Sequence, residues 1–161
     1  MGSNLSEALD IFRSMGKQQH PDFAAVLHSQ GGVLQKLGRY EDALKKYKEA
    51  LKIRRNVLGD NHETVATSLQ QVAMIYSGQG RLEQGLAMLE EALGISIRAL
   101  GPDHPKVAET HFLVAISFLK LNNEKGALPH ARESVRIYRI HGISHGVALD
   151  ANALLGDLES Q

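Results

Sequence analysis

The stretch LGDNHETVATSLQQVAMIYSGQGRLEQGLAMLEEALGISIRALGPD, residues 58–103, determines the fold, because it is one complete copy of a unit that recurs on both sides of it. It opens with LGDNH, and the same pattern returns as LGPDH at residues 100–104. Four histidines mark the register: His20, His62, His104 and His145 are separated by 42, 42 and 41 residues. A fixed period of about 20–50 residues is typical of a repeat array, in which each unit packs on its neighbours.

Aligning the copies on these histidines shows which positions they share. Small residues recur where two backbones approach closely, and large apolar residues recur where a gap must be filled. Spacings of three, four and seven residues are typical of one helix face, so each copy is expected to form a hairpin of two helices. The shared columns are Ala24, Ala66 and Ala108; Gly31, Ala73 and Ala115; Leu34, Tyr76 and Phe118; Ala43, Gly85 and Ala127; Tyr47, Leu89 and Ala131; Ala50, Ala92 and Ser134; and Ile53, Ile95 and Ile137.

These columns resemble the tetratricopeptide repeat, which has a small residue in its first helix and an alanine, aromatic, alanine pattern in its second. The usual repeat has about 34 residues, and this one is longer. The longer period, the LGxxH linker and the segments YEDALKKYKEALKI and RLEQGLAMLEEALGI resemble the kinesin light chain type of the family. The family's usual proline after the second helix is absent from all copies, which fits a longer second helix. The resemblance covers residues 20–158 and implies an all-α, right-handed superhelical solenoid of antiparallel helix pairs.

The sequence predicts one domain, residues 1–161, with about eight helices. It divides into a half repeat at 4–19, repeats at 20–61, 62–103 and 104–143, and a half repeat at 144–161. The first helices are expected at 21–37, 63–77 and 105–121, and the second helices at 40–58, 82–100 and 124–140. Glycines or asparagines follow most of these segments and are typical helix stops. The half repeats contribute a second helix near 6–15 and a first helix near 144–158.

The two end helices are predicted to leave part of an apolar face uncovered. The residues concerned are Leu5, Leu9 and Phe12 at one end and Leu149 and Leu155 at the other. Such helices are either caps or the cut edges of a longer array. Because a second helix normally packs against the next first helix, the two ends are complementary and favour head-to-tail association of copies.

Composition excludes several classes of partner and chemistry. Eighteen lysines and arginines balance 18 aspartates and glutamates, which gives no general attraction to nucleic acid or to an anionic membrane. Cysteine is absent, so disulfide and thiolate chemistry are excluded. There is no apolar run of about 18 residues and no signal-like apolar core. We therefore expect a cytoplasmic protein with no nucleic-acid or membrane partner.

The repeated histidines have a structural and a chemical interpretation. As linker residues they can hydrogen-bond at helix starts; as metal ligands they lie in successive linkers, too far apart to share one ion. His141 and His145 are four residues apart, but Gly142 lies between them in a predicted turn and no third ligand is evident. No phosphate-binding loop and no set of nucleophile, base and orienting residue is present. The sequence thus predicts no metal, no cofactor and no catalytic residue, and hence a protein that is not an enzyme.

The predicted second helix at 40–58 is basic. It carries Lys45, Lys46, Lys48, Lys52, Arg54 and Arg55. A basic stripe can bind phosphate or an acidic peptide. Acidic residues are interspersed and no stacking aromatic residues accompany the stripe, which favours a solvated convex face.

The concave face is the informative one, because in this family the first helices line a groove. The positions that match the family's groove positions are His28, Ser29, Gly32 and Gln35 in the first repeat, Gln70, Gln71 and Met74 in the second, and Phe112, Leu113, Ile116 and Leu119 in the third. Kinesin light chains usually carry asparagine at the first of these sites; glutamine amides can also donate and accept hydrogen bonds. His28 and Phe112 depart from the pattern. Gly32 is expected to leave the floor open, and the apolar third set is expected to be covered by the helix near 144–158, by a peptide or by another chain.

The sequence therefore predicts a non-catalytic module that binds a peptide or a helix in its concave groove, in an adaptor or scaffold role. Apolar contacts are expected near the third repeat and amide contacts near the second. The alternative is a structural module that assembles with copies of itself through its terminal helices.

Overall fold

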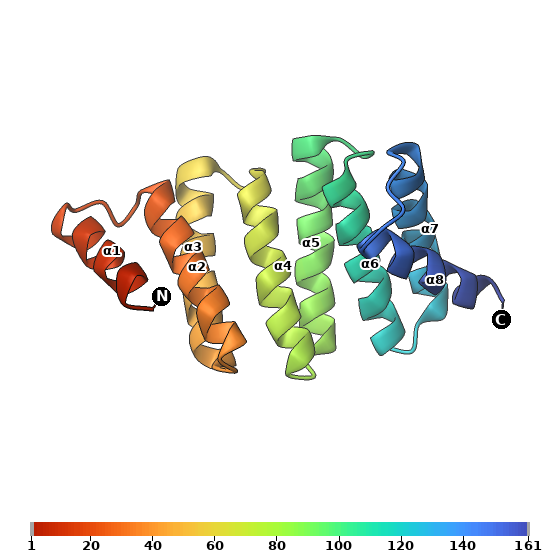
Figure 1. Cartoon of the computed structure of the whole chain (residues 1–161), viewed down its shortest axis with the longest axis horizontal. Coiled ribbons are helices and arrows are strands. Elements are labelled where there is room, and N and C mark those ends of the chain that lie inside the picture. The colour runs from red at the N-terminus through yellow and green to blue at the C-terminus, as the bar shows by residue number, and fades with distance from the viewer. Residues whose placement is uncertain (1, 161) are drawn as a thin grey trace.

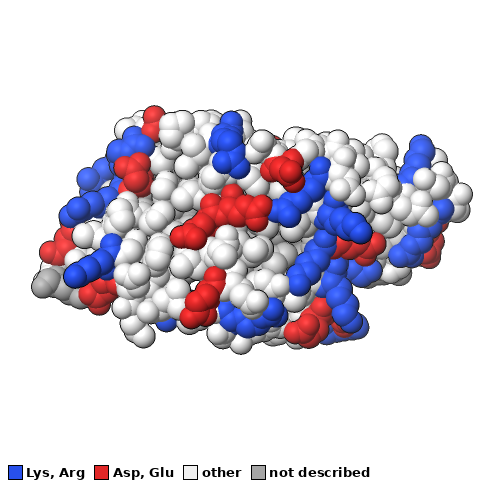
Figure 2. All heavy atoms as spheres, turned by 180° about the vertical axis from the view of Figure 1, so that it is seen from behind, with Lys and Arg blue, Asp and Glu red and all other residues white. Residues whose placement is uncertain are grey.

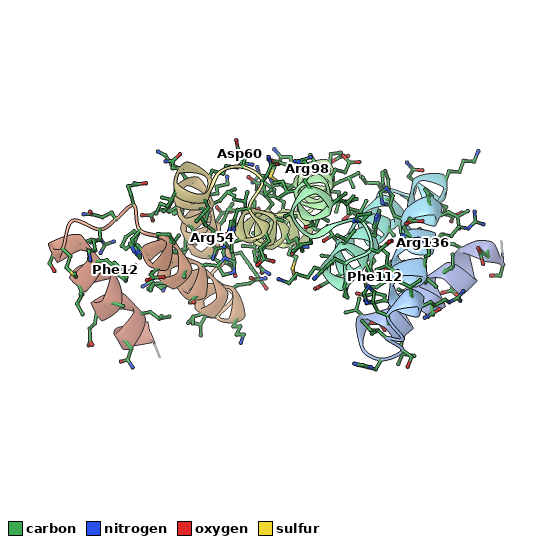
Figure 3. All side chains as sticks on the ribbon, turned by 90° about the horizontal axis from the view of Figure 1, so that it is seen from above. Phe12, Arg54, Asp60, Arg98, Phe112 and Arg136 are labelled. Atoms are coloured by element: carbon green, nitrogen blue, oxygen red, sulfur yellow. The ribbon has the colours of Figure 1, made fainter. Side chains whose placement is uncertain are left out.

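The computed structural model describes residues 2–160, with side chains from residue 4 onward, and this part of the chain forms eight helices and no strand. Three antiparallel pairs stack in chain order, with one helix before and one after them (Figure 1). The first helices form one row and the second helices another (Figure 3). The two rows follow an arc whose concave side is the row of first helices. The helices are α1 (Gly2–Ser14), α2 (Pro21–Lys36), α3 (Tyr40–Leu58), α4 (Glu63–Gly78), α5 (Leu82–Leu100), α6 (Pro105–Lys120), α7 (Glu124–Ile140) and α8 (Val147–Glu159).

Three of the four register histidines begin a first helix. The Nδ1 atoms of His20, His62 and His104 accept a hydrogen bond from the backbone N–H two residues later, at 3.2, 3.3 and 3.1 Å. Each bond satisfies one of the N–H groups that the first turn of a helix leaves without a partner. This confirms the structural interpretation of these histidines.

The fourth copy starts differently. Gly146, at φ 58°, occupies the cap position of α8, so the helix begins at Val147 instead of the predicted residue 144. The register histidine His145 is exposed and precedes this turn. At the other end of the chain, α1 runs over Gly2–Ser14 instead of 6–15.

The second helices end where glycine permits a left-handed backbone. Gly59 and Gly101 have φ 84° and 88°, and their N–H groups donate to the carbonyls of Arg55 and Ile97. Only glycine adopts such a backbone without strain. The predicted bounds of α3 and α5 agree with the structure for this reason. Those of α7 also agree, although its cap residue is His141 and the glycine with positive φ, Gly142, comes one residue later.

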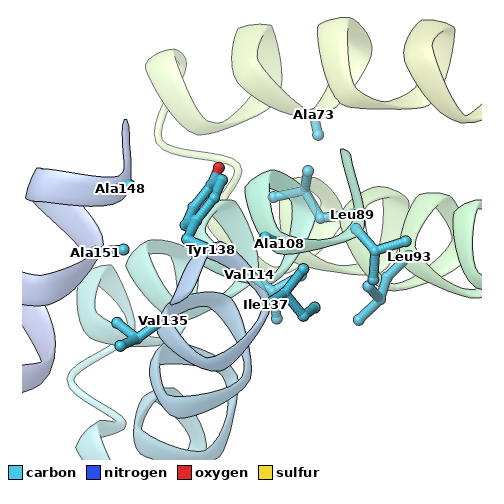
Figure 4. Packing of buried hydrophobic residues seen from close by; sticks show 11 residues of the cluster. Ala73, Leu89, Leu93, Ala108, Val114, Val135, Ile137, Tyr138, Ala148 and Ala151 are labelled. Atoms are coloured by element: carbon cyan, nitrogen blue, oxygen red, sulfur yellow. The ribbon is translucent and has the colours of Figure 1, made fainter. Parts of the chain in front are cut away.

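The shared columns form the core. Nearly all of their members are buried, and the small members lie where helices cross. Figure 4 shows the cluster at the third repeat, where Tyr138 of α7 lies among Ala108 of α6 and Ala148 and Ala151 of α8. Burial raises the pKa of Tyr138 to about 12, with Glu109 contributing in the same direction. At the first end, Leu9 is buried against Phe23, Ala24 and Leu27, so the expectation that Leu9 lies on an uncovered face is wrong.

The basic side chains of α3 lie on the convex face, with the exception of Arg54. Figure 2 shows basic side chains gathered over α3 and α7, with acidic side chains over α5 between them. Lys45, Lys48 and Lys52 are exposed, as predicted. Arg54 is not part of this face: it is 8% exposed and lies between α2 and α4. Its assignment to the solvated face is therefore wrong.

Candidate interaction groove

In the first repeat, the predicted groove residues surround Tyr47 of α3. The Tyr47 hydroxyl donates to Gln35 Oε1 at 2.9 Å, and the rings of His28 and Tyr47 lie 5.0 Å apart. A Cβ on Gly31 would lie 2.7 Å from Tyr47 Cε1, whereas a Cβ on Gly32 would lie 3.7 Å from the hydroxyl. The floor beneath Gly32 is thus occupied by Tyr47, and His28 and Gln35 contact α3. Ser29 is exposed and donates to the carbonyl of Ala25.

This packing predicts opposite effects at two adjacent glycines. Gly31→Ala is expected to lower the free energy of unfolding by about 1–2 kcal/mol, because overpacking against Tyr47 outweighs the gain in helix propensity. Gly32→Ala, which meets only ordinary contact, is expected to raise it by about 0.5–1 kcal/mol. Urea titrations of both variants test this. Equal changes in the two variants would show that Tyr47 does not lie against Gly31.

Arg54 closes the gap between the first and second repeats. Its Nη1 donates to Ser68 Oγ at 2.6 Å and to the Thr64 carbonyl at 3.1 Å, and lies 3.4 Å from His28 Nδ1. Burial lowers the pKa of the guanidinium. Burial, together with the charge of Arg54, lowers the pKa of His28 to about 4, so the His28 imidazole is neutral at neutral pH.

The groove is open between α4 and α6. A hollow of about 250 Å³ lies there, with Ala66, Ser96 and Leu100 at its base. Gln70 and Gln71, which the sequence analysis assigns to the groove of the second repeat, both line it. Gln70 Nε2 donates to Thr110 Oγ1 at 2.8 Å and so links the two helices. Gln71 makes no hydrogen bond within residues 2–160, which leaves its amide for a ligand. Met74, one turn further along α4, is 46% exposed.

In the third repeat, the apolar residues are partly covered by α8. Phe112 and Leu113 pack against the cluster that contains Ala148 and Ala151. Leu119 packs in a second cluster together with Leu154, Leu155 and Leu158 of α8. Ile116 is half-buried. The last helix, α8, thus covers part of the second apolar face of α6.

One further column of the repeat alignment decides the shape of the groove floor. The residue after the last apolar column is Arg54 in the first repeat, Ser96 in the second and Tyr138 in the third. Arg54 and Tyr138 are large and fill their gaps, whereas Ser96 is small and lies at the base of the open hollow. The 42-residue period alone could have revealed this difference.

Within residues 2–160, no group of three or more histidine, cysteine or carboxylate side chains is placed to hold a metal ion. His141, considered above as half of a metal pair, lies with Nε2 2.6 Å from the carbonyl of Asp103. None of the described helices is long and apolar enough to cross a membrane.

Comparison with known proteins places the chain in a family. The model of the tetratricopeptide repeat matches residues 22–84 and 69–140. The chain therefore belongs to the tetratricopeptide repeat family, whose folds serve as protein-interaction modules. No curated protein sequence matches the chain.

Solved structures narrow the fold to the kinesin light chain type. BtubC (BKLC) from P. vanneervenii is 19% identical, with a TM-score of 0.82 over 98% of this chain and 66% of its own. A kinesin light chain-type protein with nearly identical TPR-like repeats from Podosopora anserina is 18% identical, with a TM-score of 0.81 over 99% of this chain and 76% of its own. PcrH, in complex with the chaperone binding region of PopD, is 17% identical, with a TM-score of 0.68 over 86% of this chain and 92% of its own. The fold is thus a right-handed superhelical solenoid, and this chain spans about two thirds of the BtubC chain.

Proposed function

We propose that the chain binds a peptide or a helix of a partner protein along the face formed by α2, α4 and α6. The observation that carries this proposal is the open hollow between α4 and α6, which the side chains of this protein do not fill. Beside it stand the Gln71 amide and the exposed Met74, which offer hydrogen bonds and apolar contact. The PcrH structure supports the proposal, because a related fold is seen there with a segment of another protein.

The proposal is tested with Met74→Glu and a matched control. Peptides are selected by display on the wild-type chain, and their affinities are measured by fluorescence anisotropy. We expect Met74→Glu to weaken them at least tenfold, because a charge would replace an apolar contact on the groove face. Val57→Glu is the control, since Val57 is 40% exposed but lies on α3. Peptides that bind Met74→Glu at full strength but not Val57→Glu would place the site on the row of second helices.

Exposed apolar side chains near both ends of the array support a second candidate function, in which copies of the chain assemble with one another. Ile11 and Met15 are 59% and 55% exposed at one end, and Ile140 and Leu149 are 57% and 59% exposed at the other. Sedimentation at several concentrations separates the two functions. Concentration-dependent association that Leu149→Glu abolishes would favour assembly, and a monomer that still binds the selected peptides would favour the groove.

A further inference from the structure

The hollow between α4 and α6 has the dimensions and surroundings of a socket for one side chain. Its apolar base is formed by Ala66 and Leu100, and Ser96 stands where the neighbouring gaps hold Arg54 and Tyr138. The same backbone thus accommodates a guanidinium or a phenol at two of its three equivalent positions. At the equivalent position of the second repeat, which Ser96 occupies, a volume of about 250 Å³ remains for a side chain of another molecule.

Several polar groups around the socket have an acceptor oxygen that no other described residue uses. Within residues 2–160, the Ser96 hydroxyl has no hydrogen-bond partner, yet it is not enclosed as the unpartnered Ser134 hydroxyl is. The amide of Gln70 uses its N–H to bond Thr110 Oγ1, which leaves its carbonyl oxygen as an acceptor. Glu109 lines the socket, is exposed, and makes no hydrogen bond or ion pair with another described residue.

Three charged residues line the socket, namely Glu63, Lys106 and Glu109, and their net charge is negative. Lys106 is paired with Glu63, at 3.1 Å between Nζ and Oε2. Glu109 is left without a counter-ion. A charge at such a rim favours an opposite charge on the ligand. Lysine and arginine side chains combine a long apolar stem with a head that only donates hydrogen bonds, which matches an apolar base beneath an acceptor-rich, negative rim.

We propose that the space between α4 and α6 is a specificity socket for a lysine or arginine side chain of the bound peptide. The stem lies on Ala66 and Leu100, and the head donates to Glu109, Gln70 and Ser96. This inference rests on the proposed function, since it identifies one residue of the ligand in the same groove.

The test uses peptides selected by display on the wild-type chain, each with a partner peptide in which one lysine or arginine is replaced by alanine. Wild type is expected to bind the basic form at least tenfold more tightly. In Ser96→Tyr, which fills the socket with the side chain found at position 138, and in Glu109→Gln, the preference is expected to fall below threefold. Glu109 is exposed, so Glu109→Gln keeps the test valid even if Ser96→Tyr folds poorly. Glu90→Gln, the same charge change on an exposed residue of α5, is expected to retain the full preference.

Two outcomes overturn the socket. In the first outcome, the peptides whose binding depends on Met74 show no preference for a basic residue, or they carry an acidic or aromatic residue at the position where a lysine or arginine is expected. In the other, the tenfold preference persists in both Ser96→Tyr and Glu109→Gln. In either case the groove remains a binding site and the socket alone is rejected. If no selected peptide depends on Met74, the proposed function fails and the socket fails with it.

Discussion

Replacing Tyr47 by alanine is expected to lower the free energy of unfolding by about 3–5 kcal/mol, the range typical of large-to-small changes at a buried aromatic residue. Tyr47 is 2% exposed and fills the space beneath Gly31. Its hydroxyl also holds Gln35 at 2.9 Å. Alanine would leave a cavity between α2 and α3, because the two helices are fixed by other contacts and can close only part of the gap.

Two further substitutions separate packing from hydrogen bonding. Tyr47→Phe keeps the ring and loses the bond to Gln35, so it should lower the free energy of unfolding by only about 1 kcal/mol. Tyr40→Ala, on the same helix but 52% exposed, should change it by no more than about 0.5 kcal/mol. Guanidinium titrations measure all three. A loss for Tyr47→Ala no larger than that for Tyr40→Ala would mean that the first repeat is not packed as described.

The repeat register made most of the fold predictable, because its signals are local. The second helices α3, α5 and α7 lie where predicted, and α3 and α5 stop at Gly59 and Gly101 because these glycines permit the left-handed backbone that ends a helix. The start of α8 was missed because Gly146, not the register histidine, takes the cap position. A period fixes where an element should lie, and a single turn residue can still move its end by several positions.

The groove was less predictable, because side-chain direction depends on the neighbouring repeat. From the sequence, Arg54 is indistinguishable from the other cations of a basic helix. In the structure, hydrogen bonds to Ser68 and Thr64 of the next repeat hold its side chain in the interior. His28 was assigned to the ligand face, but it contacts Arg54 and Tyr47. Gln70 and Gln71 do line the open hollow. The two glutamines differ from His28 in the floor residue beneath them, which is Ser96 instead of Arg54. The periodicity within one helix does not distinguish these two floor residues, although aligning the 42-residue repeats does.

Acidification from pH 6.5 to about pH 4 is expected to destabilise the protein by about 2–4 kcal/mol through two histidines. Burial and the charge of Arg54 lower the pKa of His28 from 6.5 to about 4. Burial, with His130 and Arg136, does the same for His111, against the opposing effect of Glu133. Each shift corresponds to about 3 kcal/mol in full, and we expect about half of that because both rings are partly open to solvent.

The sign follows from proton binding. Below pH 6.5 the unfolded chain takes up protons at both histidines, whereas the folded chain does so only near pH 4. The stabilisation is therefore complete above pH 6.5, is lost between pH 6.5 and 4, and changes no further below that through these two groups. His130, whose Nδ1 lies 2.9 Å from that of His111, adds to the loss because burial also lowers its pKa, against the opposing effect of Glu90.

Urea titrations at intervals between pH 7.5 and 3.5 measure this dependence. His28→Asn and His111→Asn are each expected to remove about half of the slope between pH 6.5 and 4, because asparagine binds no proton in this range. The double variant should be nearly flat there, apart from the contribution of His130. A double variant as steep as wild type would show that other groups cause the acid sensitivity and that neither imidazole is held neutral by its surroundings.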